Sequence, residues 1–123
     1  MNKKVLFITD SLEDLDLKKD TSILMMEESI KLGFDVYQCL VEDLYAENSE
    51  VIVFAKKITK AGSSEIKFED ASTHSIKTFE YSFMRKDPPV DEDYINALHL
   101  LGLAQAMGTK VFNNPVSIKE FNE

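Results

Sequence analysis

The sequence contains a single cysteine and no long apolar run. Cys39 stands alone among 123 residues, which excludes an internal disulfide and favours a reducing compartment, the cytoplasm. No stretch approaches the roughly 20 apolar residues of a membrane-spanning helix. The apolar run at residues 5–8 is also too short for a secretory signal. We therefore expect a cytoplasmic protein without a membrane segment.

Basic residues are also scarce. Fourteen Lys and Arg residues stand against 22 Asp and Glu residues, so the formal net charge is −8. That sign is wrong for a protein that binds nucleic-acid phosphates or anionic lipids, so we expect neither partner. With 44% hydrophobic and 29% charged residues, the composition is that of a folded globular protein. The length predicts a single domain over residues 1–123.

The sequence lacks the common motifs for nucleotide binding, metal binding and nucleophilic catalysis. Neither G-x-G-x-x-G nor G-x-x-x-x-G-K-[ST] occurs. His74 and His99 have no second His or Cys at metal-ligand spacing, and Cys39 has no His near it in the sequence. We predict no catalytic residue and no metal site in this chain, and we expect Cys39 to be a small buried side chain.

The first forty residues show a strand, helix and strand pattern. Residues 4–9 are almost wholly apolar, which is typical of a parallel strand covered on both faces. Residues 21–32 hold good helix formers, with Asp20 to cap the start and Gly33 to end the helix. Residues 34–40 predict a second strand, reached by a right-handed crossover.

A second helix and several further strands are predicted in the rest of the chain. Residues 91–107 predict a helix that ends at Gly108. Its two apolar stripes predict that more than one face is covered, with Leu98 in the core. The further strands are predicted at residues 51–55, 66–68, 78–84 and 110–113, the first two as a short antiparallel hairpin.

Together these elements predict an α/β fold with three layers. The sheet is expected to be Rossmann-like and mostly parallel, with a short antiparallel hairpin in the middle. In such sheets, ligands bind beyond the carboxyl ends of the strands, where loops lead into helices. Three predicted loops fit this description, at residues 10–20, 85–91 and 113–117.

Basic side chains occur as adjacent pairs in the first two of these loops. The pairs are Lys18 with Lys19 and Arg85 with Lys86. Arginine binds a carboxylate through two parallel hydrogen bonds, and the predicted helix starts offer free backbone N–H groups. The pattern favours a small carboxylate or phosphate ligand. Two solvated surface charge pairs are the alternative interpretation.

Three segments read LDLKKDTS at residues 15–22, MRKDPPVDEDY at residues 84–94 and GTKVFNNP at residues 108–115. Their order and spacing resemble those of the first domain of bacterial glutathione synthetase. The resemblance is close at both ends of the chain and weak from residue 47 to residue 79. Ser11 stands where relatives usually have proline. The resemblance implies a domain of the pre-ATP-grasp type.

The resemblance further implies that the parent protein is an ATP-grasp ligase. Members of that family join glycine to γ-glutamylcysteine with ATP and Mg²⁺, through an acyl phosphate, and their ATP and metal sites lie in later domains. The resemblance therefore implies that this chain is the amino-terminal part of a homo-oligomeric enzyme, holds no cofactor and is inactive alone. The S-x-x-E capping box at residues 117–120 agrees with a helix that continues past Glu123.

The resemblance also implies roles for individual residues. Arg85 is expected to guide a substrate carboxylate, and Asp87 to orient Arg85 or Lys86 rather than act as a base. The implied substrate-facing residues are Lys18, Lys19, Asp20, Thr21, Ser22, Arg85, Lys86, Asp87, Pro88 and Pro89, and the implied hinge residues are Asn113, Asn114 and Pro115.

Two alternatives stay open at the level of sequence. Asp10, directly after the first predicted strand, is also typical of a free-standing flavodoxin-like or receiver-like binding module. The first domain of another ATP-grasp carboxylate-amine ligase would share the fold and differ in the acid and the amine that it joins. The gene sequence beyond Glu123 would separate the ligase from the binding module.

Overall fold

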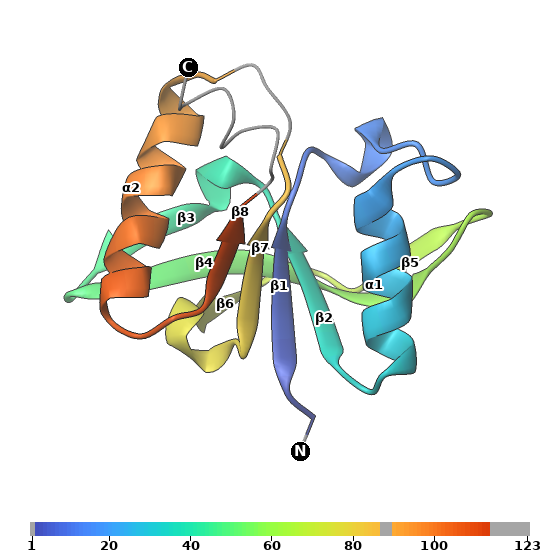
Figure 1. Ribbon diagram of the computed structural model, residues 1–123, viewed down its shortest axis with the longest axis horizontal. Helices are drawn as coiled ribbons and strands as arrows, with labels where there is room; N and C mark the ends of the chain where they lie inside the picture. Colours follow the sequence, from blue (N-terminus) through green and yellow to red (C-terminus); the bar gives the residue numbers. More distant parts are fainter. Residues whose placement is uncertain (1, 87–89, 114–123) are drawn as a thin grey trace.

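A computed structural model describes residues 2–86 and 90–113 and shows an open β-sheet with one helix on each face (Figure 1). Four central strands run parallel to one another in the spatial order β2, β1, β7, β8. The predicted three-layer, Rossmann-like arrangement is confirmed. The bounds of these strands are Lys4–Ile8 for β1, Asp35–Cys39 for β2, Tyr81–Met84 for β7 and Val111–Asn113 for β8.

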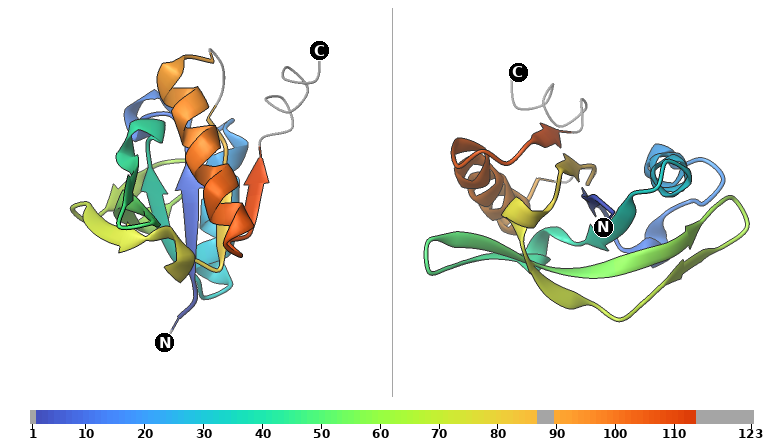
Figure 2. Two further views of the ribbon diagram at one scale, coloured as in Figure 1. Left: turned by 90° about the vertical axis from the view of Figure 1, so that its left-hand side faces the viewer. Right: turned by 90° about the horizontal axis from the view of Figure 1, so that it is seen from below.

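Helix α1 (Thr21–Lys31) covers one face of the sheet and helix α2 (Glu92–Ala106) covers the opposite face (Figure 2). Helix α1 begins where the sequence predicts, because the Asp20 carboxylate accepts a hydrogen bond from the Ser22 backbone N–H at 2.7 Å. Asp91 caps α2 in the same way. Neither helix in the described part of the chain is long and apolar enough to cross a membrane.

Strand β1 is buried on both faces, as its apolar run predicts. Successive side chains of a strand point to opposite faces. Leu6 and Ile8 therefore join the apolar cluster beneath α2, whereas Val5 and Phe7 join the cluster beneath α1. None of the four is more than 2% exposed. Strand β1 thus connects two hydrophobic cores.

The outer side of α2 is less covered than its sequence predicts. Leu101 is 2% exposed, but Ile95, Leu103 and Met107 are 41%, 46% and 58% exposed. Leu98 lies at the edge of the cluster and is only partly buried. The prediction that more than one face of this helix is covered is wrong for the described residues, because α2 packs only against the sheet side.

The antiparallel part of the sheet is larger than the short hairpin predicted. Strand β4 pairs antiparallel with β2, β3, β5 and β6, which gives a mixed sheet of eight strands. The bounds of these strands are Leu44–Glu47 for β3, Glu50–Ala61 for β4, Ile66–Phe68 for β5 and Ser72–Ser75 for β6. Short 3₁₀ helices occupy Leu12–Asp14 (η1), Val41–Asp43 (η2) and Ile76–Thr78 (η3).

A row of phenylalanine rings crosses three parallel strands on the α1 side. Phe7 is the register partner of Phe83, and Phe83 is the partner of Phe112. The ring centroids are 5.0 Å and 5.3 Å apart, and both pairs are stacked. Phe7 is fully buried, whereas Phe112 on β8 is 48% exposed. The row therefore begins in the core and ends at the surface.

The chain runs outward from the centre of the sheet in two directions. From β1 it passes through α1 to β2 on one side, and from β7 it passes through α2 to β8 on the other side. The switch point lies between the neighbouring strands β1 and β7 (Figure 1). Ligands of open α/β sheets bind in the crevice beyond the carboxyl ends of strands at such a point. The fold therefore directs attention to the residues after Ile8 and Met84.

Candidate functional site

The residues that follow β1 and β7 lie side by side at the switch point. The Arg85 backbone N–H donates a hydrogen bond to the Ile8 carbonyl at 2.8 Å, so the strand pairing extends one residue past β7. Thr9 and Asp10 follow β1 directly. Because backbone pairing holds both segments, the starting points of the Arg85 and Asp10 side chains are fixed relative to each other.

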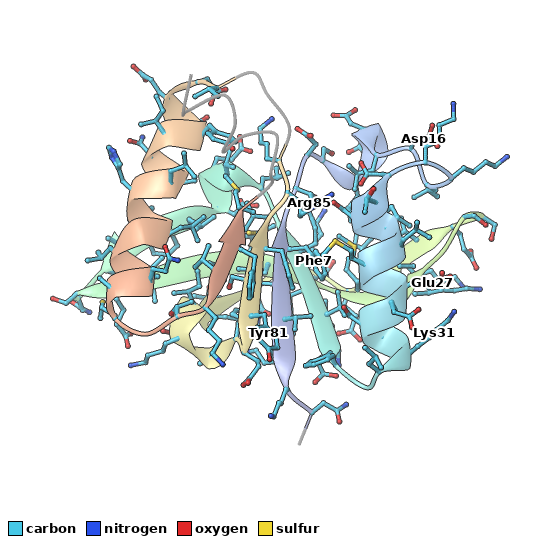
Figure 3. The ribbon with its side chains drawn as sticks, in the orientation of Figure 1. Phe7, Asp16, Glu27, Lys31, Tyr81 and Arg85 are labelled. Carbon is cyan, nitrogen blue, oxygen red and sulfur yellow. The ribbon has the colours of Figure 1, made fainter. Side chains whose placement is uncertain are left out.

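Arg85 reaches the first turn of α1 (Figure 3). Its Nε donates to the Ser22 Oγ at 3.3 Å, and Ser22 is itself 2% exposed. The two terminal guanidinium nitrogens make no hydrogen bond to any residue that the structure describes. They form a planar pair of donors that matches a carboxylate or phosphate. Arg85 is thus held at one end and presents two donors at the other, beside the positive end of the α1 dipole.

Lys86 forms an ion pair that the sequence did not predict. Its Nζ lies 2.7 Å from the Asp10 Oδ1, and the two side chains are 17% and 30% exposed. The Asp10 carboxylate thus lies against the Lys86 ammonium, and Arg85 adds a second cation beside this ion pair. The signal in the sequence was the position of Asp10 directly after a buried strand.

The other predicted cations lie farther from the switch point. Lys18 and Lys19 are exposed in the loop before α1. This loop lies at the end of the sheet where β7 finishes (Figure 1). The Lys18 backbone N–H donates to the Asp16 carboxylate at 3.0 Å, which shapes this loop. No hydrogen bond or ion pair joins either lysine to Arg85 within the described residues. Asp16 itself lies well outside the switch point (Figure 3).

The remaining predicted residues divide into two groups. The Asp20 carboxylate is engaged in capping α1, and Thr21 is exposed in the first turn. Asn113 is the backbone register partner of Met84 at the end of β8. The others, Asp87, Pro88, Pro89, Asn114 and Pro115, lie outside the described residues.

Cys39 is a small buried side chain, as the sequence predicts. It is 2% exposed at the end of β2. Burial raises the pKa of its thiol well above the usual value, and the nearby Asp43 carboxylate raises it further. The thiol therefore stays protonated at neutral pH. Within residues 2–86 and 90–113, no group of three His, Cys, Asp or Glu side chains gathers where it could hold a metal ion.

Fold and site together define an α/β domain with polar and charged side chains gathered at the switch point of its sheet, and comparison with known proteins identifies its family. Residues 3–119 match the family described as prokaryotic glutathione synthetase, N-terminal domain. The chain belongs to this family.

Curated relatives support the same assignment. The chain is 35% identical over 120 residues to the glutathione synthetase of Prochlorococcus marinus subsp. pastoris, an alignment that covers 98% of this chain and 38% of the relative. It is 34% identical over 126 residues to that of Neisseria meningitidis serogroup A, covering 98% and 40%. It is 30% identical over 122 residues to that of Salmonella typhi, covering 98% and 39%. The chain thus spans about two fifths of the length of these relatives.

Proposed function

We propose that this domain forms the substrate-binding wall of a glutathione synthetase that joins glycine to γ-glutamylcysteine. The observation that carries the proposal is the position of Arg85 at the switch point, anchored to Ser22 and presenting two donors. The relatives are glutathione synthetases, and the family match favours this function over a flavodoxin-like module. The antiparallel strand β4 also departs from the wholly parallel sheet of such a module.

In this proposal, Arg85 holds a carboxylate of the dipeptide while the reaction proceeds elsewhere on that substrate. A ligase of this kind phosphorylates one carboxylate and must keep water away until the amine attacks. The side chain of Arg85 needs little reordering because Ser22 already holds its Nε. Lys18, Lys19 and Thr21 would lie at the outer edge of the same substrate site, and the segment around residues 113–115 would lead to the next domain.

ATP and Mg²⁺ would bind to the part of the parent protein that follows this chain. We assign no residue of the chain to either of them, because the described residues gather no metal-binding group and the sequence has no phosphate-binding loop. The proposal includes a homo-oligomeric parent enzyme in the cytoplasm, in line with the single buried cysteine.

Substituting Arg85 in the parent enzyme tests the proposal. We expect Arg85→Ala to raise the KM for γ-glutamylcysteine by roughly 10- to 100-fold, because a charged hydrogen bond contributes about 1.5–3 kcal/mol. The KM for ATP should stay the same. Steady-state kinetics with each substrate varied in turn measures both constants.

The matched control is Lys31→Ala, which removes a cation from the far end of α1. It should leave both constants unchanged, and Arg85→Lys should restore only part of the dipeptide affinity because lysine cannot form the two parallel bonds. An unchanged dipeptide KM in Arg85→Ala would remove Arg85 from the substrate site.

A further inference from the structure

A second pocket lies at the junction between the parallel sheet and the antiparallel strands. It has a volume of about 220 Å³, and its walls come from the turn after β1, the end of β2, β4 and the segment between β5 and β6. Its apolar walls are Leu12, Leu40, Phe54 and Ala71. Pockets for drug-sized ligands measure about 300–1,000 Å³, so this one has room for a single flat ring system.

Gln38 gives the pocket a defined hydrogen-bonding character. The side-chain nitrogen Nε2 donates to the Thr9 Oγ1 at 3.0 Å and to the Cys39 carbonyl at 3.2 Å. The Thr9 hydroxyl gives its own proton to the Asp10 carbonyl at 2.7 Å, so it can only accept from Gln38. These contacts fix the orientation of the amide and turn its oxygen Oε1 away from them.

The Gln38 amide oxygen is an acceptor in a nearly closed environment. Gln38 is 3% exposed and lines the pocket, and no described residue donates a hydrogen bond to its Oε1. This oxygen is not one of the fully buried side-chain atoms that lack a partner, so solvent reaches it. A ligand donor that replaces water at this acceptor gains about 0.5–1.5 kcal/mol, the net contribution of one hydrogen bond. The pocket therefore favours a molecule with an N–H or O–H group.

The charged residues of the pocket are already engaged. The Asp43 Oδ2 accepts a hydrogen bond from the Leu40 backbone N–H at 2.9 Å. The Lys56 ammonium stands over the Phe68 ring, 4.5 Å from its centroid. With both charges held by protein groups, the pocket has no strong demand for a charged ligand.

We propose that this pocket binds a small uncharged molecule whose flat apolar body carries one N–H or O–H donor. The body would lie against Phe54 and Leu12, and the donor would bond to the Gln38 Oε1. Neither Arg85 nor Ser22 lines this pocket, although the Gln38 amide contacts the Thr9 hydroxyl and the Asp10 carbonyl. The proposal does not rest on the ligase function.

Indole and 1-methylindole are suitable probes, because they have the same ring system and only indole has a donor. A titration of the ¹⁵N-labelled 123-residue chain, followed by NMR, should show indole shifting the amide signals of Leu12, Leu40 and Ala71. We expect indole to bind about tenfold more tightly than 1-methylindole, the factor that one hydrogen bond of about 1.4 kcal/mol supplies. Equal affinities, or shifts confined to other residues, would overturn the proposal.

Two variants test the location of the probe. Phe54→Ala removes an exposed wall, and Ala71→Leu fills the pocket from the opposite side; each should weaken indole binding at least fivefold. Tyr45→Ala, which removes an exposed ring from β3 outside the pocket, is the matched control and should bind indole like the original chain. If both pocket variants keep a native spectrum and bind indole normally, the site is not this pocket. If one variant fails to fold, the other decides.

Discussion

At the scale of single residues, a polar cluster around Lys4 lies at the start of β1. The Lys4 ammonium donates to the His74 Nδ1 and to the Thr78 Oγ1, both at 3.0 Å, and stands 4.6 Å from the Phe79 ring centroid. An ammonium group only donates, so His74 is neutral and its Nε2 proton is directed to the Ser72 Oγ at 2.8 Å. Burial lowers the pKa of His74, and the Lys4 charge lowers it further.

This cluster predicts a loss of stability in mild acid. The pKa of His74 lies below the ordinary value of 6.5 in the fold, so the unfolded chain binds a proton first as the pH falls. The contribution of neutral His74 to the free energy of unfolding is therefore complete above about pH 7. It is lost as the pH falls through and below 6.5. The variant His74→Gln keeps an acceptor for Lys4 but cannot titrate. We expect its free energy of unfolding to depend less on pH in this range.

Urea unfolding at pH 7.5 and pH 5.5 measures the effect. Carboxylates also titrate toward the lower pH, so the informative quantity is the difference between variants. His99→Gln on the exposed side of α2 is the matched control and should retain the original pH dependence. A His74→Gln variant with the original pH dependence would show that the histidine does not cause it.

At the scale of elements, α2 has one buried side and one open side. Leu101 is 2% exposed and Leu103, two residues away, is 46% exposed. We expect Leu101→Ala to lower the free energy of unfolding by about 2–5 kcal/mol, through lost burial and a residual cavity. Leu103→Ala should change it by less than about 0.5 kcal/mol. Thermal or urea unfolding measures both, and equal losses would mean that the helix is oriented differently.

The elements that the sequence predicted well are those with local signals. The continuous apolar run of β1, the Asp20 cap, and the glycines at positions 33 and 108, with φ of 93° and 105°, all mark features that the structure contains. The sequence predicted only residues 51–55 of strand β4. The rest of the strand was missed because it carries several polar side chains. Strand β6 reads STHS, and its pairing with β4 depends on contacts that no local pattern shows.

At the scale of the whole molecule, the sequence predicted that the loops after the first strand and after Met84 lie at the same edge of the sheet, but it did not predict which of their side chains pair. The rule that ligands bind beyond strand ends pointed to Arg85 and to the start of α1. Which partner each cation takes depends on the order of strands across the sheet. Because β1 lies next to β7, Asp10 meets Lys86 across 76 positions of sequence, and Arg85 meets Ser22.

The same organisation predicts that the 123-residue chain is inactive by itself. It spans about two fifths of its relatives, and its described residues gather no metal-binding group. We expect no hydrolysis of ATP and no formation of glutathione when the chain is incubated with ATP, Mg²⁺, glycine and γ-glutamylcysteine. The parent enzyme is the positive control. Mass spectrometry measures glutathione, and its production by the separate chain would contradict the prediction that the chain is inactive by itself.

The phenylalanine row on β1, β7 and β8 affects the tendency of the chain to associate with itself. Its last ring, on β8, is half in solvent, and β8 has no further strand on its outer side among the described residues. Open strand edges with exposed apolar side chains are places where copies of a protein adhere to one another. A substitution that improves solubility at high protein concentration therefore belongs at Phe112, because β1 and β7 lie between β8 and strand β2, whose Gln38 lines the pocket described above.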